Sequence, residues 1–129
     1  MATYNGGKYI KKQIESIINQ SVTDWKLIVR DDGSKDETIE IIEKYVNEDS
    51  RIELVRNESE YHGAYLNFWQ LILRAKKIEP YQYYFFADQD DIWEKEKLEI
   101  FINNAERYAD IPLYIYSDMS TIDGLDNFL

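Results

Sequence analysis

The chain has 129 residues, no cysteine, 15 Lys and Arg against 25 Asp and Glu, and a net charge of −10. This composition excludes disulfides and thiolate metal sites, and it argues against nonspecific binding to nucleic acid or to an anionic membrane. A hydrophobic content of 44%, with 15% aromatic residues, supports one packed domain over residues 1–129.

The sequence lacks the signals of membrane insertion and export. No apolar run approaches the roughly 20 residues of a membrane-spanning helix, and the first residues lack the apolar stretch of a signal peptide. We therefore expect a cytoplasmic protein, located at the inner face of the membrane if the chain belongs to a longer parent.

In the first half of the chain, apolar periodicity predicts helices alternating with strands. Isoleucines at helical spacing predict a helix over residues 8–20, and short apolar runs predict strands over 25–29 and 52–55. Between these strands, Ser34 and Glu37 have the spacing of a capping box, which predicts the start of a second helix.

The second half continues this alternation. A continuous apolar run predicts a buried strand over 83–87, followed by a helix over 95–108 and a last strand over 113–117. A third helix precedes them, and its inward face is expected to comprise Tyr65, Phe68, Trp69, Ile72 and Leu73. Strands and helices that alternate in this way indicate an α/β protein with a mostly parallel sheet flanked by helices.

Both ends of the sequence are expected to be incomplete. Met1-Ala2-Thr3 resembles the end of a strand, and residues 121–129 have no periodic pattern. Further segments of a longer chain would then complete the sheet. An edge left exposed favours association, so we expect a homo-dimer.

Three polar clusters follow predicted strands, at residues 3–7, 31–34 and 88–91. In open parallel sheets, ligands bind at the carboxyl ends of the strands. Because those ends lie at one edge of the sheet, we expect the three clusters to meet there.

The acidic cluster at 88–91 is a candidate metal site. Asp88 and Asp90 can present oxygens to one hard cation, and substrate phosphates and water normally complete the shell of Mg²⁺. A solvated acidic turn before the next helix is the alternative that this spacing leaves open. An EF-hand is excluded, because Trp93 stands where that loop requires glycine.

The other polar residues give weaker signals. Asp31 and Asp32 can accept hydrogen bonds from a ligand N–H, whereas Gly33 and Ser34 fit a turn and a helix cap. The single histidine, His62, is interpreted as a loop residue without a role. Because no phosphate-binding glycine motif is present, a metal ion rather than a glycine loop would hold phosphate.

Several motifs occur together in a fixed order. They are Met1-Ala2-Thr3-Tyr4-Asn5-Gly6, Tyr9-Ile10, residues 13–17, Gln20, residues 31–34 with Asp36 and Thr38, Gly63 with Asn67-Phe68, and residues 86–93 with Lys97-Leu98. In this order they resemble family 2 glycosyltransferases, and among these the bacterial rhamnosyltransferase-like enzymes that build surface polysaccharides. The resemblance extends over nearly the whole chain.

The resemblance implies a GT-A (Rossmann-like) fold and an inverting transfer of sugar from a nucleoside-diphosphate sugar to a glycan or lipid-linked acceptor. The D-x-D position of the family matches Asp88 and Asp90, with Asp91 close by, and implies bound Mg²⁺ or Mn²⁺. The residues implied to bind the nucleotide are Ala2, Thr3, Asp31, Asp32 and Asp88. In the family the acceptor-binding half and the catalytic base lie beyond the equivalent of Leu129, so no base is assigned.

The main alternative is a nucleotide-binding fragment or regulatory module that is catalytically silent. A receiver domain would need a lysine after the last strand, and none follows residues 113–117. A sugar nucleotidyltransferase would carry a glycine-rich loop with arginine where Tyr4-Asn5-Gly6-Gly7 stands.

Overall fold

Three short parallel strands form the centre of the structure, a computed structural model that describes residues 1–78, 80–108, 111–123 and 127. They are β1 (Ala2–Thr3), β2 (Leu27–Asp31) and β3 (Ile52–Arg56), in the order β1-β2-β3. In register, Thr3 lies beside Asp31, and Asp31 lies beside Arg56. The predicted parallel sheet of an α/β protein is confirmed.

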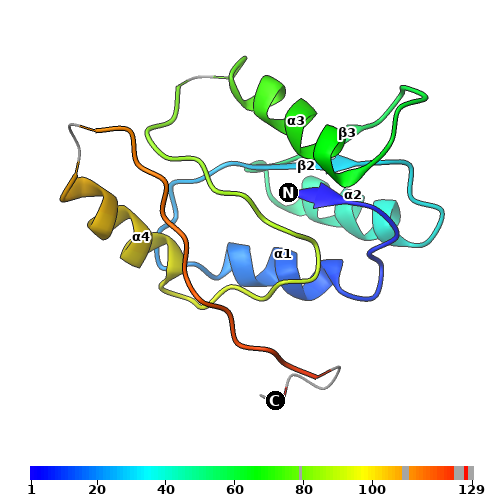
Figure 1. Ribbon diagram of the computed structural model, residues 1–129. Coiled ribbons are helices and arrows are strands. Elements are labelled where there is room, and N and C mark those ends of the chain that lie inside the picture. Colours follow the sequence, from blue (N-terminus) through cyan, green and yellow to red (C-terminus); the bar gives the residue numbers. More distant parts are fainter. Residues whose placement is uncertain (79, 109–110, 124–126, 128–129) are drawn as a thin grey trace.

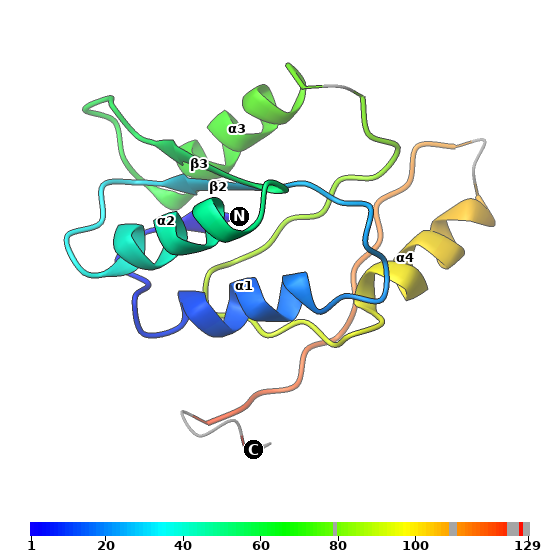
Figure 2. The same cartoon turned by 180° about the vertical axis from the view of Figure 1, so that it is seen from behind.

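The helices cover both faces of this sheet (Figure 1). α3 (Ala64–Ala75) packs on β1 and β2, while α1 (Ile10–Ile18) and α2 (Thr38–Glu48) lie on the opposite face. The view from behind shows the same two layers, with α4 (Lys97–Glu106) beside the end of α1 (Figure 2). All four predicted helices are therefore present, and the first and the last are shorter than predicted.

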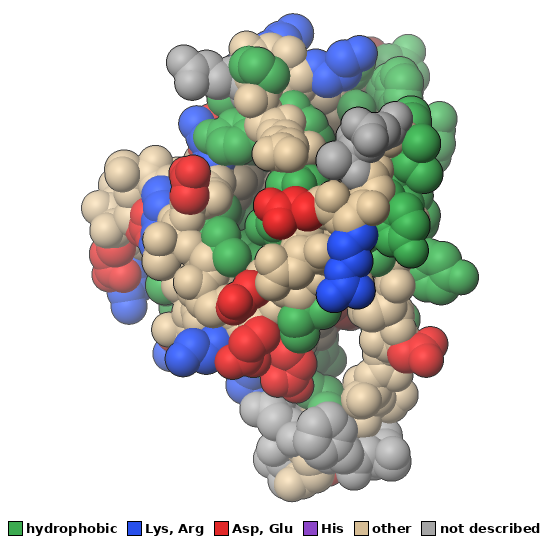
Figure 3. Space-filling model, turned by 90° about the vertical axis from the view of Figure 1, so that its left-hand side faces the viewer, with side chains coloured by type: hydrophobic (Ala, Val, Ile, Leu, Met, Phe, Trp, Pro, Cys, Tyr) green, Lys and Arg blue, Asp and Glu red, His purple; other side chains and the backbone are tan. Residues whose placement is uncertain are grey.

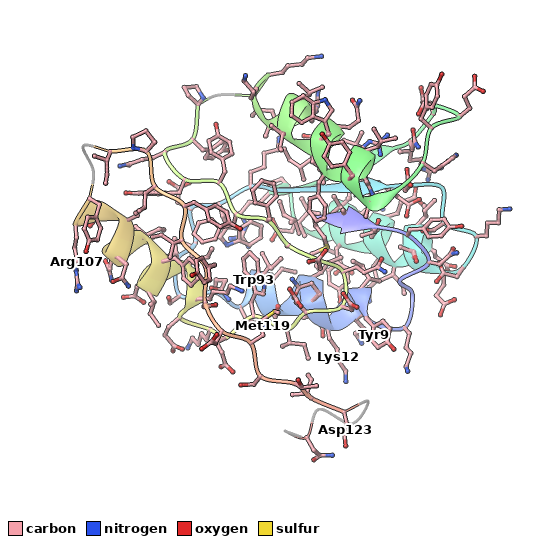
Figure 4. All side chains as sticks on the ribbon, in the orientation of Figure 1. Tyr9, Lys12, Trp93, Arg107, Met119 and Asp123 are labelled. Atoms are coloured by element: carbon pink, nitrogen blue, oxygen red, sulfur yellow. The ribbon has the colours of Figure 1, made fainter. Side chains whose placement is uncertain are left out.

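The hydrophobic core lies between the sheet and α1 and α2. Ile10, Ile14, Val29 and Ile42 are fully buried there. Trp93 extends this core toward α4 (Figure 4): its backbone N–H donates to Ser16 Oγ, 3.0 Å away. α1 and α2 are therefore amphipathic helices, each of which buries its apolar face against the sheet.

Two predicted strands are wrong. Residues 83–87 are not assigned to a strand, and among the described residues their only backbone bond to the sheet is the one that Ala2 N–H donates to the Ala87 carbonyl at 3.3 Å. Residues 113–117 form no strand either, and Tyr114 and Tyr116 are exposed. A strand needs a neighbour for its backbone groups, and β1, only two residues long, offers little pairing.

The start of β2 also differs from the prediction. Trp25 lies before the strand, and the Arg51 guanidinium stacks on its ring 3.7 Å from the centroid. Pairing with β3 begins at Leu27, and the strand continues to Asp31. The polar residues expected in the turn therefore begin inside the strand.

α3 buries a different face from the one predicted. Its buried residues are Asn67 and Leu71, whereas Tyr65 is 78% exposed and Trp69 is 47% exposed. Asn67 determines this orientation, since it hydrogen-bonds the backbone of β1 and β2. Exposed apolar side chains gather along the right-hand border of the face in Figure 3.

The predicted capping box is wrong. α2 begins at Thr38, its N-cap is Glu37, and no side chain caps it. Ser34 Oγ instead donates to Asp31 Oδ1 at 2.5 Å and accepts from the Asn5 backbone N–H at 2.8 Å. Ser34 is therefore part of the turn after β2, bound to the loop that follows β1.

A buried carboxylate organises that turn. Asp31 is 1% exposed, and its Oδ2 accepts the backbone N–H groups of Gly33 and Ser34 at 2.9 and 2.8 Å. Its Oδ1 accepts the Thr3 hydroxyl at 3.0 Å, so the side chain also holds β1. Gly33 permits the turn because its φ is 91°.

The described part of the chain contains no helix with both the length and the apolar character needed to cross a membrane. Of the terminal stretch 121–129, residues 124–126 and 128–129 lie outside the described residues.

We predict that Asp31→Asn lowers the free energy of unfolding by about 1–3 kcal/mol. An amide accepts through one oxygen only, so donors on its other side lose their acceptor in a buried place. Urea unfolding followed by circular dichroism measures the change. The matched control is Asp24→Asn, an exposed residue before β2, expected within about 0.5 kcal/mol of the parent. Equal stability of the two variants would contradict the prediction.

Candidate functional site

One cavity of about 720 Å³ opens at the carboxyl ends of β1 and β2. It brings together the three polar clusters, as expected from the sequence. The residues that line it are Ala2, Thr3, Tyr4, Asp32, Gly33, Lys35, His62, Gly63, Ala64, Asn67, Phe68, Asp88, Gln89 and Asp90.

At one end of the cavity, the Asp32 carboxylate accepts hydrogen bonds from the loop before α3. Oδ2 accepts the Gly63 backbone N–H at 2.7 Å, and Oδ1 accepts Asn57 Nδ2 at 2.8 Å. His62 Nδ1 lies 2.9 Å from the Asp32 carbonyl oxygen, so this histidine also binds the turn after β2. A carboxylate accepts about four hydrogen bonds, so Asp32 retains capacity for a ligand donor.

Arg30 and Asn67 support Asp32 from within the protein. The buried Arg30 guanidinium donates to Asn67 Oδ1 at 2.8 Å and lies 3.5 Å from Asp32 Oδ1. Asn67 Nδ2 in turn donates to the carbonyl oxygens of Thr3 and Arg30. The guanidinium thus places a positive charge beside the buried Asp32 carboxylate.

At the other end, Asp88 and Asp90 are exposed, and neither has a hydrogen-bond or ion-pair partner among the described residues. Asp91 is half-buried: burial raises its pKa, and the charges of Asp88 and Asp90 add to this, while Lys97 opposes it. The three carboxylates therefore repel one another, which is the electrostatic condition that a bound cation relieves.

The described residues contain no group of three or more His, Cys, Asp or Glu arranged to hold a metal ion unaided. Asp88 and Asp90 offer two hard oxygen ligands to the cavity. That donor set fits Mg²⁺ or Mn²⁺ whose shell substrate phosphates and water complete.

The structure places the predicted site residues in two groups. Ala2, Thr3, Asp32, Asp88 and Asp90 line the cavity, whereas Asp31 and Asp91 do not. Asp31 lies behind it and holds the turn, and Asp91 faces Lys97. Their roles toward a ligand stay predictions.

Sequence reasoning missed several lining residues. Asn67 stands four positions before Leu71 on the buried face of α3, but the local apolar pattern gave no signal for it. His62, interpreted as a residue without a role, lines the cavity and bonds Asp32. Lys35 and Gln89 have no distinguishing pattern in the sequence.

Comparisons with known proteins agree with this geometry. A family model described as "Glycosyl transferase family 2" matches residues 1–121. The chain is 38% identical over 115 residues to the dTDP-rhamnosyl transferase RfbG of Shigella flexneri, covering 84% of this chain and 39% of RfbG. It is 34% identical over 103 residues to UDP-Glc:alpha-D-GlcNAc-diphosphoundecaprenol beta-1,3-glucosyltransferase WfgD of Escherichia coli, covering 80% and 38%.

Solved structures show the same fold. TarS 1-349 of S. aureus in complex with UDP-GlcNAc superposes with a TM-score of 0.66 and 29% identity, over 84% of this chain and 30% of that one. The complex of TarS 1-349 with UDP matches equally, with a TM-score of 0.66 and 27% identity. The chain thus spans between a third and two fifths of RfbG and WfgD, and about a third of the TarS fragment.

The parallel sheet, the cavity at its carboxyl edge and these matches lead to one assignment. The chain has the GT-A fold and belongs to glycosyl transferase family 2.

Proposed function

We propose that the chain is the nucleotide-sugar-binding part of an inverting glycosyltransferase for polysaccharide biosynthesis. Its donor is a nucleoside-diphosphate sugar, and its acceptor is a glycan or a lipid-linked glycan. RfbG is named for a dTDP sugar, WfgD for UDP-Glc and a lipid diphosphate, and TarS was solved with UDP and UDP-GlcNAc. These names support the class of donor.

The observation that carries the proposal is the polarity of the cavity. A hydrogen-bond acceptor, Asp32, follows β2 on one side of β1. Asp88 and Asp90 follow Ala87, which is bonded to the other side of β1, and neither carboxylate has a hydrogen-bond or ion-pair partner among the described residues. A nucleoside diphosphate has base N–H donors at one end and strongly anionic phosphates at the other. It matches this cavity only when a divalent cation lies between phosphate and carboxylates.

In the proposed mechanism Asp88 and Asp90 hold Mg²⁺ or Mn²⁺. When bound, this cation supplies Lewis-acid stabilisation of the charge that develops on the departing diphosphate.

The chain's own residues bind and orient the donor. Asp32 accepts a base N–H, while Ala2 and Thr3 at the end of β1 form the floor of the cavity. Phe68 lines the same cavity and packs edge-on against Phe86, with 5.8 Å between ring centroids, which gives the pocket a firm apolar wall. No described acid is assigned as the catalytic base.

Because the chain spans a minor part of its relatives, binding of the donor nucleotide is the appropriate readout. The catalytically silent module stays the alternative for this chain. The homo-dimer and the cytoplasmic location expected from the sequence also stay predictions.

We predict that binding of UDP or dTDP requires Mn²⁺ or Mg²⁺ and that Asp90→Asn weakens it at least about tenfold. The substitution keeps the shape of the side chain but removes one charged ligand, and tenfold corresponds to about 1.4 kcal/mol. Calorimetric titration with and without Mn²⁺ measures the effect.

The matched control is Asp24→Asn, which removes the same charge before β2, at the opposite edge of the sheet. It should bind as the parent does. Equal affinity in chelator and in Mn²⁺, or parental binding by Asp90→Asn, would refute the metal assignment.

We predict that Asp32→Ala weakens uridine and UDP binding about tenfold or more, with Mn²⁺-pyrophosphate binding unchanged. The side chain lies at the nucleoside end, so the phosphate end keeps its ligands. Competition titrations with uridine, UDP and pyrophosphate separate the two ends.

Asp32 also holds the loop before α3, so the control is Asn57→Ala, which removes one loop contact and keeps the carboxylate. We expect a smaller loss of uridine affinity for Asn57→Ala. If both variants lose uridine affinity equally, the effect belongs to the loop and the base contact is wrong.

A further inference from the structure

The side chain of Gln89 joins the segment that carries Asp88 and Asp90 to the loop after β1. The Tyr4 backbone N–H donates to Gln89 Oε1 at 2.9 Å, and Gln89 Nε2 donates to the Tyr4 carbonyl at 3.2 Å. One amide thus pairs with both backbone groups of a residue 85 positions away. Gln89 stands between Asp88 and Asp90, and all three line the cavity.

This contact continues the sheet where backbone pairing stops. Ala2 N–H donates to the Ala87 carbonyl, and two residues further along each segment Tyr4 pairs with Gln89. Paired residues recur at a period of two along neighbouring strands. The side-chain amide of Gln89 therefore bonds Tyr4 in the position where a peptide group of a neighbouring strand would do so.

Gly6 provides the space for this arrangement. A Cβ on Gly6 would lie 2.3 Å from Gln89 Oε1 and 2.6 Å from Gln89 Cδ. A Cβ atom does not approach unbonded atoms this closely, so the Gln89 side chain lies directly against the Gly6 backbone. The loop after β1 is thus shaped to accept this amide.

Residues 88–92 make few other hydrogen bonds to the rest of the protein. Within the described residues, Gln89 is the only member of 88–92 that hydrogen-bonds the rest of the protein. The next attachments along the chain are Ala87, bound by Ala2, and Trp93, bound by Ser16. The positions of the Asp88 and Asp90 carboxylates therefore depend on this one amide.

We propose that Gln89 is a positioning residue, which sets the distance between the carboxylates of Asp88 and Asp90 and the nucleoside end of the cavity. The inference rests on the proposed function, because it assumes a metal at those carboxylates. Loss of the contact should uncouple the metal from the nucleotide, and each should still bind at its own end.

The experiment measures the metal–nucleotide coupling, which is the ratio of the Kd for UDP in chelator to the Kd in Mn²⁺. Gln89→Met keeps the length of the side chain and removes both hydrogen bonds. Gly6→Ala displaces the same amide from the other side. We expect each variant to reduce the coupling about tenfold or more and to leave metal-free uridine binding, followed by NMR titration, unchanged.

A double-mutant cycle makes the test specific. Gln89→Ala removes the atoms that a Gly6 Cβ would meet, so Gly6→Ala should have no further effect in that background. The matched control is Gly7→Ala, whose Cβ would lie 2.8 Å from Glu37 Cδ, in the same loop but away from Gln89. Its coupling should equal that of the parent, even where its thermal stability falls.

The outcomes separate the two claims. A parent chain without metal-dependent UDP binding overturns the proposed function. Metal dependence in the parent with unchanged coupling in Gln89→Met overturns the positioning role alone. If uridine affinity falls in parallel with the coupling, Gln89 has only a structural role and the inference is overturned. Additive effects in the cycle overturn it too.

Discussion

The arrangement of the site depends on one buried carboxylate, that of Asp31. A carboxylate out of water is stable only when hydrogen bonds replace its hydration, and here two backbone N–H groups and two hydroxyls do so. Through Thr3 it holds β1, and through Ser34 it holds the loop at Asn5. The turn after β2 is thereby joined to the loop after β1, and these two segments supply Tyr4, Asp32 and Gly33 to the cavity.

The two ends of the cavity differ in how their charge is compensated. Asp32 is buried against Arg30 and already accepts protein donors, so its position is fixed before any ligand arrives. Asp88 and Asp90 are solvated and have no partner in the described part of the chain. A rigid acceptor and an uncompensated anionic pair suit a ligand that brings its own donors at one end and needs a cation at the other. The acidic net charge of the chain therefore agrees with a function that recruits cations.

The sequence predicts those features that depend on neighbours along the chain. The isoleucines of α1 and the apolar run of β3 have the right period, and Asp88, Asp90 and Asp32 follow apolar segments that end at one edge. Other features were predicted wrongly. Residues 83–87 have a strand-like composition but no full partner strand, and Ser34 bonds Asp31, three residues before it, instead of capping α2. The inward face of α3 is determined by Asn67, whose acceptors lie on β1 and β2 and have no trace in the local pattern.

The contact between Tyr4 and Gln89 has a consequence for the order of folding. At ribosomal rates of 5–20 residues per second, a separation of 85 residues means that Gln89 is synthesised roughly 4 to 17 seconds after Tyr4. β2, β3 and the helices α1 and α2 lie between them in the sequence and are complete earlier. The nascent chain therefore exposes the edge of β1 during synthesis, and the cavity can form only after residues 88–90 have left the ribosome.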